Sequence, residues 1–122
     1  MSVFLFPAIL AAVIAAIHAI AGGRDNAGPL LRQDALSRTV TLTHYYCWHM
    51  ATISLVGLSG AFGYAALALD GRILAVFATL VSGMFCLWGL ALVLWTRQRH
   101  RDLPQWTLFA GLTASGIRAL LA

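Results

Sequence analysis

The sequence has no lysine and no glutamate, and only 10% of its 122 residues are charged. Soluble domains carry a charge on about a quarter of their residues, so this composition excludes an ordinary water-soluble domain. All four acidic residues are aspartates, and none of them lies inside a long apolar run. Ion-driven pumps commonly use a carboxylate buried within a transmembrane helix. The lack of such a carboxylate argues against that class of transport protein.

Apolar side chains, by contrast, are abundant: 61% of the residues are hydrophobic, and they form four long runs. A hydrocarbon core of about 30 Å requires roughly 20 apolar residues per helix. We therefore predict an all-α integral membrane protein, a four-transmembrane-helix bundle with short loops that forms one domain over residues 1–122. The predicted spans cover approximately residues 3–21, 39–69, 73–96 and 104–121.

The runs are separated by residues that form turns. The sequence Gly22-Gly23-Arg24-Asp25-Asn26 combines turn-forming residues with charge, which predicts the end of the first span. Gly28-Pro29 predicts the start of a short interfacial helix, because proline suits the first position of a helix. Asp70-Gly71-Arg72 predicts a tight turn between the second and third spans. No basic segment precedes the first span, so we expect it to be retained rather than cleaved as a signal peptide.

All eight basic residues are arginines, and they lie at the predicted ends of the spans. Six fall in the two predicted loops on one side of the membrane, whereas the other side holds only Arg72 and Arg118. The positive-inside rule then predicts that both termini lie on the outer side. We expect a bacterial inner-membrane protein, for which the outer side is the periplasm. Charges placed at span ends are typical of contact with lipid headgroups, not with nucleic acid. The predicted headgroup contacts are Arg24, Arg32, Arg38, Arg97, Arg99 and Arg101.

Histidines within the predicted spans are the main functional candidates, because ionisable side chains are costly there. His18 lies near the end of the first span, and His44, Cys47 and His49 lie near the start of the second. We predict His18 and His49 as a facing pair. One hypothesis is that this pair binds haem b or copper, with His44 and Cys47 as further metal ligands. The alternative is that the histidines form only hydrogen bonds that lock two helices together.

Helical periodicity assigns faces to these segments. His18 shares a stripe with Ala11, Ala15 and Gly22, which are small enough for close helix contact. Counted from the predicted helix ends, His49 lies roughly 15 Å from the start of its helix and His18 only about 5 Å from the end of its own. On the second span, Gly57, Gly60 and Gly63 accompany His49 and predict a face that packs on other helices. The face of His44 is assigned to lipid or to another protein, with Trp48, Leu55 and Phe62 as the predicted interface.

Three kinds of function remain open. The chain offers no complete catalytic set, which favours a protein that is not an enzyme but an accessory, structural or assembly subunit of a larger membrane complex. Its partners would then be other membrane proteins or further copies of itself, and the surrounding lipid. The second possibility is the haem- or metal-binding protein just described. The third is a small permease that works as an oligomer, since four helices alone enclose little space.

Overall fold

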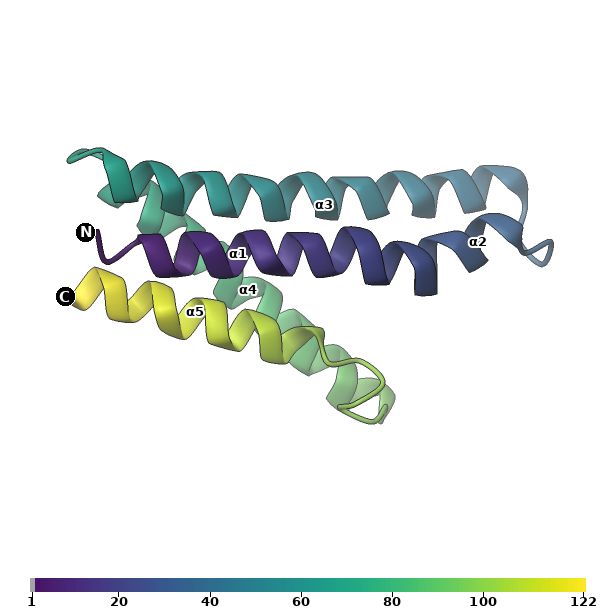
Figure 1. The fold of residues 1–122 in the computed structure, drawn as a ribbon. Coiled ribbons are helices and arrows are strands. Elements are labelled where there is room, and N and C mark those ends of the chain that lie inside the picture. Colours follow the sequence, from purple (N-terminus) through teal and green to yellow (C-terminus); the bar gives the residue numbers. More distant parts are fainter. Residues whose placement is uncertain (1) are drawn as a thin grey trace.

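The structure is a computed structural model that describes residues 2–122, and among these residues it contains helices and short connections but no strand (Figure 1). The helices are α1 (Leu5–Ile17), the π-helical segment η1 (His18–Ala27), α2 (Gly28–Arg32), α3 (Arg38–Leu67), α4 (Arg72–Thr96) and α5 (Gln105–Leu121). Because α1, η1 and α2 run on without a break, the chain forms four long helical stretches. The predicted all-α fold with four helices is confirmed.

Three of these stretches are long and apolar enough to cross a membrane: Leu5–Arg32, Arg38–Leu67 and Arg72–Thr96. Helix α5 has 17 residues, which places it at the lower limit of length for a transmembrane helix. Large hydrophobic side chains are exposed on all four stretches, for example Ile53, Leu80 and Trp95. An apolar exterior of this extent suits lipid better than water. Length and composition thus support membrane character for three of the four predicted spans.

The first helix does not end at residues 22–26, so that prediction is wrong. The chain keeps its helical hydrogen bonding through both glycines by winding more widely in η1, where π-helical bonds join residues five apart. It leaves the helix only at Gln33, whose backbone is extended. The separate interfacial helix predicted from Gly28-Pro29 is therefore also wrong, because Gly28–Arg32 is the last part of the first helical stretch.

The other helix ends follow from local chemistry. The Ser37 hydroxyl caps α3 by accepting a hydrogen bond from the backbone N–H of Val40, at 3.4 Å. The predicted turn at residues 70–72 connects α3 to α4, and the backbone N–H of Gly71 donates to the carbonyl oxygen of Ala68 at 3.1 Å. Arg97 ends α4 in a left-handed conformation, with φ of 53°. All three remaining helices begin and end within two residues of the predicted positions.

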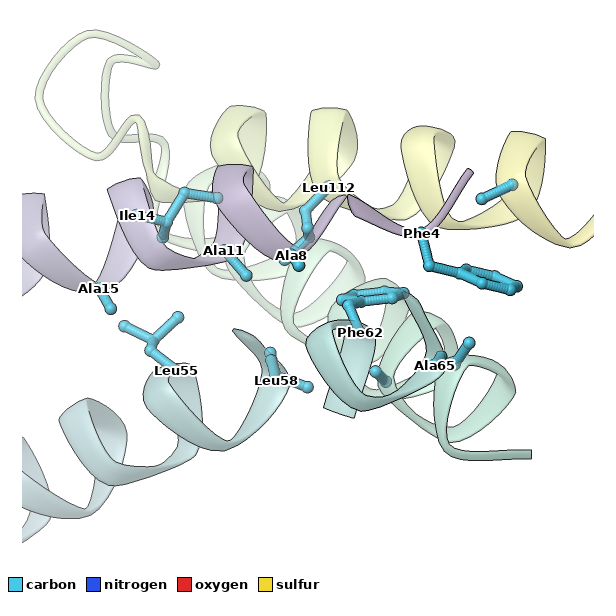
Figure 2. Packing of buried hydrophobic residues seen from close by; sticks show 13 residues of the cluster. Phe4, Ala8, Ala11, Ile14, Ala15, Leu55, Leu58, Phe62, Ala65 and Leu112 are labelled. Atoms are coloured by element: carbon cyan, nitrogen blue, oxygen red, sulfur yellow. The ribbon is translucent and has the colours of Figure 1, made fainter. Parts of the chain in front are cut away.

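The helices pack as two pairs, α1 with α3 and α4 with α5. The pairs meet at one end, which holds both termini and the α3–α4 turn, and they diverge toward the other end (Figure 1). We call these the closed end and the open end. The buried cluster between the pairs draws on all four long helices, including Ala8 and Ala11 of α1, Phe62 of α3 and Leu112 of α5 (Figure 2).

One hydrogen bond fixes the register of α1 against α3. The Ser59 hydroxyl of α3 donates to the backbone carbonyl oxygen of Ala8 in α1, at 3.0 Å. Residues that lie equally far along the two antiparallel helices from this bond are therefore at the same depth in the bundle. The bond gives a reference level for the side chains of the candidate site.

Candidate functional site

The divergence of the two helix pairs is accompanied by a cleft of about 550 Å³ between α1–η1, α3 and the α4–α5 hairpin. This volume falls in the range of roughly 300–1,000 Å³ that is usual for small-molecule sites. The exposed lining is mostly apolar, and the side chains with polar groups include His18, Asn26 and Gln105. The apolar part of the wall comes mainly from Ile14, Ile17, Leu55, Phe85, Leu92, Leu108 and Phe109, together with Trp48 and Trp88.

His18 and Trp48 form the most specific contact in the cleft wall. Their rings are stacked, with 3.9 Å between ring centroids and 17° between ring planes. The Nε2 atom of His18 lies 3.4 Å from the backbone carbonyl oxygen of Trp48, to which it donates in the Nε2-protonated tautomer. The same oxygen accepts a hydrogen bond from the Thr52 hydroxyl at 3.2 Å. Helix α3 thus supplies both the stacking partner and the hydrogen-bond partner of His18.

Gly22 provides the space for this arrangement. A Cβ atom added at Gly22 would lie 2.6 Å from Cη2 and 3.1 Å from Cζ2 of the Trp48 indole, whereas one added at Gly23 would meet nothing within 4 Å. The indole therefore rests against the backbone of η1 where a side chain is missing. The predicted stripe of His18 with Ala11, Ala15 and Gly22 is confirmed as a contact face, because both alanines are buried and Gly22 contacts α3.

His18 and His49 lie at the same depth but point in different directions. Each is ten residues from the Ser59–Ala8 hydrogen bond, which corresponds to about 15 Å along the helix. The predicted mismatch in depth is wrong because it assumed that the first helix ends at residue 21. Trp48 faces His18, so the next residue, His49, is turned about 100° away around α3. His49 is exposed and makes an edge-to-face contact with Tyr45, at 4.5 Å between ring centroids.

The other predicted metal ligands do not join this pair. His44 and Cys47 are both exposed. Within residues 2–122, no three His, Cys, Asp or Glu side chains are grouped so that they could hold a metal ion. Binding of haem or copper by His18 and His49 stays a prediction that the arrangement of these four residues does not support.

Most residues assigned to the two faces of α3 lie on the side opposite to the prediction, whereas His44 is exposed as predicted. Leu55 and Phe62, predicted to face lipid or a partner, are buried in the core, while Trp48 is half-buried against η1. Gly57, Gly60 and Gly63 face away, and in the part of the chain that the structure describes a Cβ added at any of them would meet no atom of another helix within 4 Å. Lipid solvates apolar side chains as well as a helix does, so hydrophobicity does not tell the two faces apart.

The arginines divide between the two ends as the sequence predicts. The six predicted headgroup contacts are all exposed, and they lie in η1, α2, the start of α3 and the α4–α5 loop, at the open end. Arg24 pairs with Asp25, with 2.7 Å between Nε and Oδ1. At the closed end, Arg72 donates from Nη2 to the backbone carbonyl oxygen of Leu120, at 2.6 Å.

The fold and the cleft define the class of protein: a small helical bundle with helices apolar enough to cross a membrane and an apolar cleft at its arginine-rich end. In comparisons with known proteins, no family model, no curated protein and no solved structure matches the chain. Its function is therefore inferred from its own geometry.

Proposed function

We propose that this protein is an accessory subunit of a larger membrane assembly, which it joins through the outward face of α3. We define this face by His49, Ile53, Val56, Gly57, Gly60 and Gly63. The observation that supports the proposal is the combination, on one outward face, of an exposed imidazole with three glycines at which an added Cβ would meet no other helix of residues 2–122 within 4 Å.

The three glycines lower the helix propensity of α3, and no packing contact within residues 2–122 of the same chain compensates for this loss. A glycine inside a helix is less favourable than alanine by about 1 kcal/mol. In membrane proteins, small residues at helix surfaces let a second backbone approach closely, which strengthens van der Waals contact. Gly57, Gly60 and Gly63 lie at intervals of three residues and form one shallow strip along α3. A helix of another subunit packed on this strip would account for them.

His49 supports the same assignment. An imidazole on an outward face within a membrane span faces hydrocarbon or interface, where polar groups are costly unless they find a partner. The described contact of its ring, with Tyr45, comes from the same helix. A polar group on a neighbouring subunit would supply the hydrogen bond that lipid tails cannot give. The outward face is thus suited to a helix with a small or polar surface.

The proposal includes an arrangement in the membrane. We place all four helical stretches across the bilayer, with α5, about 26 Å long at 1.5 Å per residue, as the shortest span. The open end faces the cytoplasm because six arginines lie there, and both termini face the periplasm of a bacterial inner membrane. In this arrangement Ser59, His49 and the three glycines lie within the hydrocarbon core or at its cytoplasmic boundary.

The test is co-purification from native membranes in a mild detergent. Replacing Gly60 by leucine fills the strip, and we expect co-purified partner to fall about tenfold, equivalent to about 1.4 kcal/mol of association free energy. The matched control is Gly111→Leu, since Gly111 on α5 is also an exposed glycine whose added Cβ meets nothing within 4 Å. If both variants retain the same partners in the same amounts as the parent protein, the outward face of α3 is not the docking surface.

A further inference from the structure

We propose that the cleft at the open end binds one anionic phospholipid, with an acyl chain between the two helix pairs and the phosphate group among the arginines of the α4–α5 loop. The site lies on the inner side of α3 and does not involve the outward face through which the subunit docks. Binding of lipid and docking of a partner are therefore separate properties that separate experiments can test.

The walls of the cleft select an apolar ligand. Its exposed lining is mostly hydrophobic, formed by aliphatic and aromatic side chains from α1, α3, α4 and α5. A polar ligand would lose its hydrogen bonds to water there and regain few from the protein. In a bilayer, the apolar molecules that surround the cleft are the acyl chains of lipids. A chain that enters between the helix pairs replaces the dispersion contacts that the diverging helices do not make with each other.

The size of the cleft favours a thin ligand over a helix of a partner protein. A helix about 10 Å across would fill 550 Å³ within about 7 Å of its length, which is less than two turns. Two turns are too few for a stable helix–helix contact, whereas an acyl chain is a thin, flexible rod that follows a narrow space. The cleft therefore fits a lipid chain better than it fits a peptide helix.

The charge of the loop that leads into the cleft wall favours an anionic headgroup. Leu103, Pro104 and Gln105 line the cleft, and they directly follow the loop that carries Arg97, Arg99 and Arg101. These three arginines are exposed, and the described part of the chain offers them no ion pair, unlike Arg24 with Asp25. Guanidinium groups bind phosphate oxygens through paired, charge-assisted hydrogen bonds. A phospholipid whose chain lies in the cleft thus brings its phosphate to unneutralised arginines.

Two side-chain amides in the cleft wall are polar but uncharged. Asn26 of η1 and Gln105 at the start of α5 both contribute to the lining. Each amide offers donors and an acceptor, which suits the ester and glycerol oxygens of a phospholipid. The cleft and the adjacent loop thus offer the three kinds of group that a phospholipid needs: an apolar wall for the acyl chain, amides for the glycerol esters and arginines for the phosphate.

The experiment uses Trp48 as a reporter inside the cleft wall. The full-length protein carries Trp88→Phe, Trp95→Phe and Trp106→Phe, so that Trp48 is its single tryptophan, and it is reconstituted in vesicles. Phosphatidylglycerol with brominated acyl chains quenches an indole that it touches. We expect Trp48 to be quenched, with about fivefold stronger association for brominated phosphatidylglycerol than for brominated phosphatidylcholine, the factor given by one arginine near anionic headgroups.

A matched pair of variants tests whether the quenching lipid lies in the cleft. Ala51 lines the cleft, and Ala51→Phe fills it, so quenching of Trp48 should be lost. Ala16→Phe is the control, because Ala16 is exposed outside the cleft at the same depth, eight residues from the Ser59–Ala8 bond as Ala51 is. It should leave quenching unchanged. A second protein with Trp95 as its single tryptophan reports bulk lipid and should respond to neither substitution, since Trp95 is 80% exposed.

Charge removal tests the headgroup. The triple variant Arg97→Gln, Arg99→Gln, Arg101→Gln should abolish the preference for phosphatidylglycerol while brominated chains still quench Trp48. Three outcomes overturn the proposal: quenching that Ala51→Phe does not reduce, equal quenching by the two lipids in the parent protein, or a Trp48 that is quenched in the isolated subunit but shielded in the assembled complex. The last outcome would mean that a partner protein, not a lipid, occupies the cleft in the complex. None of them depends on Gly60, so docking through the outward face is tested independently.

Discussion

The closed end and the open end of the bundle are built from different residues. At the closed end the helices approach through small side chains, since Ala75 and Ala78 are completely buried and Gly116 lies against Thr79 of α4. At the open end the contact between helices is made by large rings, with His18 stacked on Trp48 above the backbone of Gly22. At the closed end small side chains and Gly116 let α4 and α5 pack without a gap at Thr79, whereas the open end leaves a cleft.

This difference indicates where stability resides and where a ligand fits. Lipid tails solvate an apolar side chain about as well as a neighbouring helix does, so membrane helices gain stability chiefly from close packing and from hydrogen bonds between them. Close packing is available at the closed end, where small residues allow it. At the open end the rings of His18 and Trp48 lie between η1 and α3, and the two helix pairs diverge. We therefore expect substitutions at the closed end to change the free energy of unfolding, and those at the open end to change the cleft.

The largest effect is expected for Gly116→Ala at the closed end. A Cβ atom there would lie 3.1 Å from Cγ2 of Thr79 and 3.2 Å from Cζ of Phe62, and would press still closer on the Thr79 hydroxyl. That hydroxyl donates to the carbonyl oxygen of Ala75 at 2.7 Å, so it cannot turn away without losing its bond. Overpacking of this kind should lower the free energy of unfolding by about 2 kcal/mol, measured by denaturant titration in mixed micelles.

Its control is Gly111→Ala on the same helix. An added Cβ at Gly111 meets nothing within 4 Å, so this substitution should raise the free energy of unfolding by up to about 1 kcal/mol through helix propensity alone. Equal effects of the two substitutions would show that α5 does not pack closely on α4 and α3 at this level.

The sequence predicts most of this fold because its apolar runs are bounded by charge and turn residues. The boundaries of α3, α4 and α5 follow from Ser37, residues 70–72 and the arginine loop, all of which act locally. The end of the first helix does not follow in the same way. Its glycines continue the helix because Gly22 packs on Trp48, a residue 26 positions further along the chain, and no local pattern contains that contact.

The candidate site was only partly predictable for a related reason. The sequence identifies His18 and its stripe of small residues, because the spacing of a helix places them on one face. It does not show which face of α3 turns inward. Leu55 and Phe62 are as suitable for lipid as for the core, and glycines are as suitable for a partner as for a neighbouring helix of the same chain. The cleft itself depends on how the pairs diverge, which is a property of the whole bundle.

A smaller effect is expected for Gly22→Ala at the open end. The added methyl would displace the far edge of the Trp48 indole, which is half-buried and has room to move. We expect a loss of about 1 kcal/mol or less in the free energy of unfolding, at the low end of overpacking effects, but a clear shift in Trp48 emission in the single-tryptophan protein as the stacking on His18 is lost. Gly23→Ala is the neighbouring control and should leave the emission unchanged. A shift in the control alone would contradict the described position of the indole.

The smallest effect concerns the bond that lies between the two ends. Ser59→Ala removes the hydrogen bond to the carbonyl oxygen of Ala8 and should lower the free energy of unfolding by about 0.6 kcal/mol, the average for hydrogen bonds between membrane helices. Ser54→Ala is its control, because the Ser54 hydroxyl bonds to Met50 within α3 and joins no second helix. If the Ser59 hydrogen bond sets the register of α1 against α3, its removal should let His18 shift along Trp48. The emission band of Trp48 should then broaden. A change in stability without a change in Trp48 emission would place the register in the packing of the buried residues Ala11 and Leu58 instead.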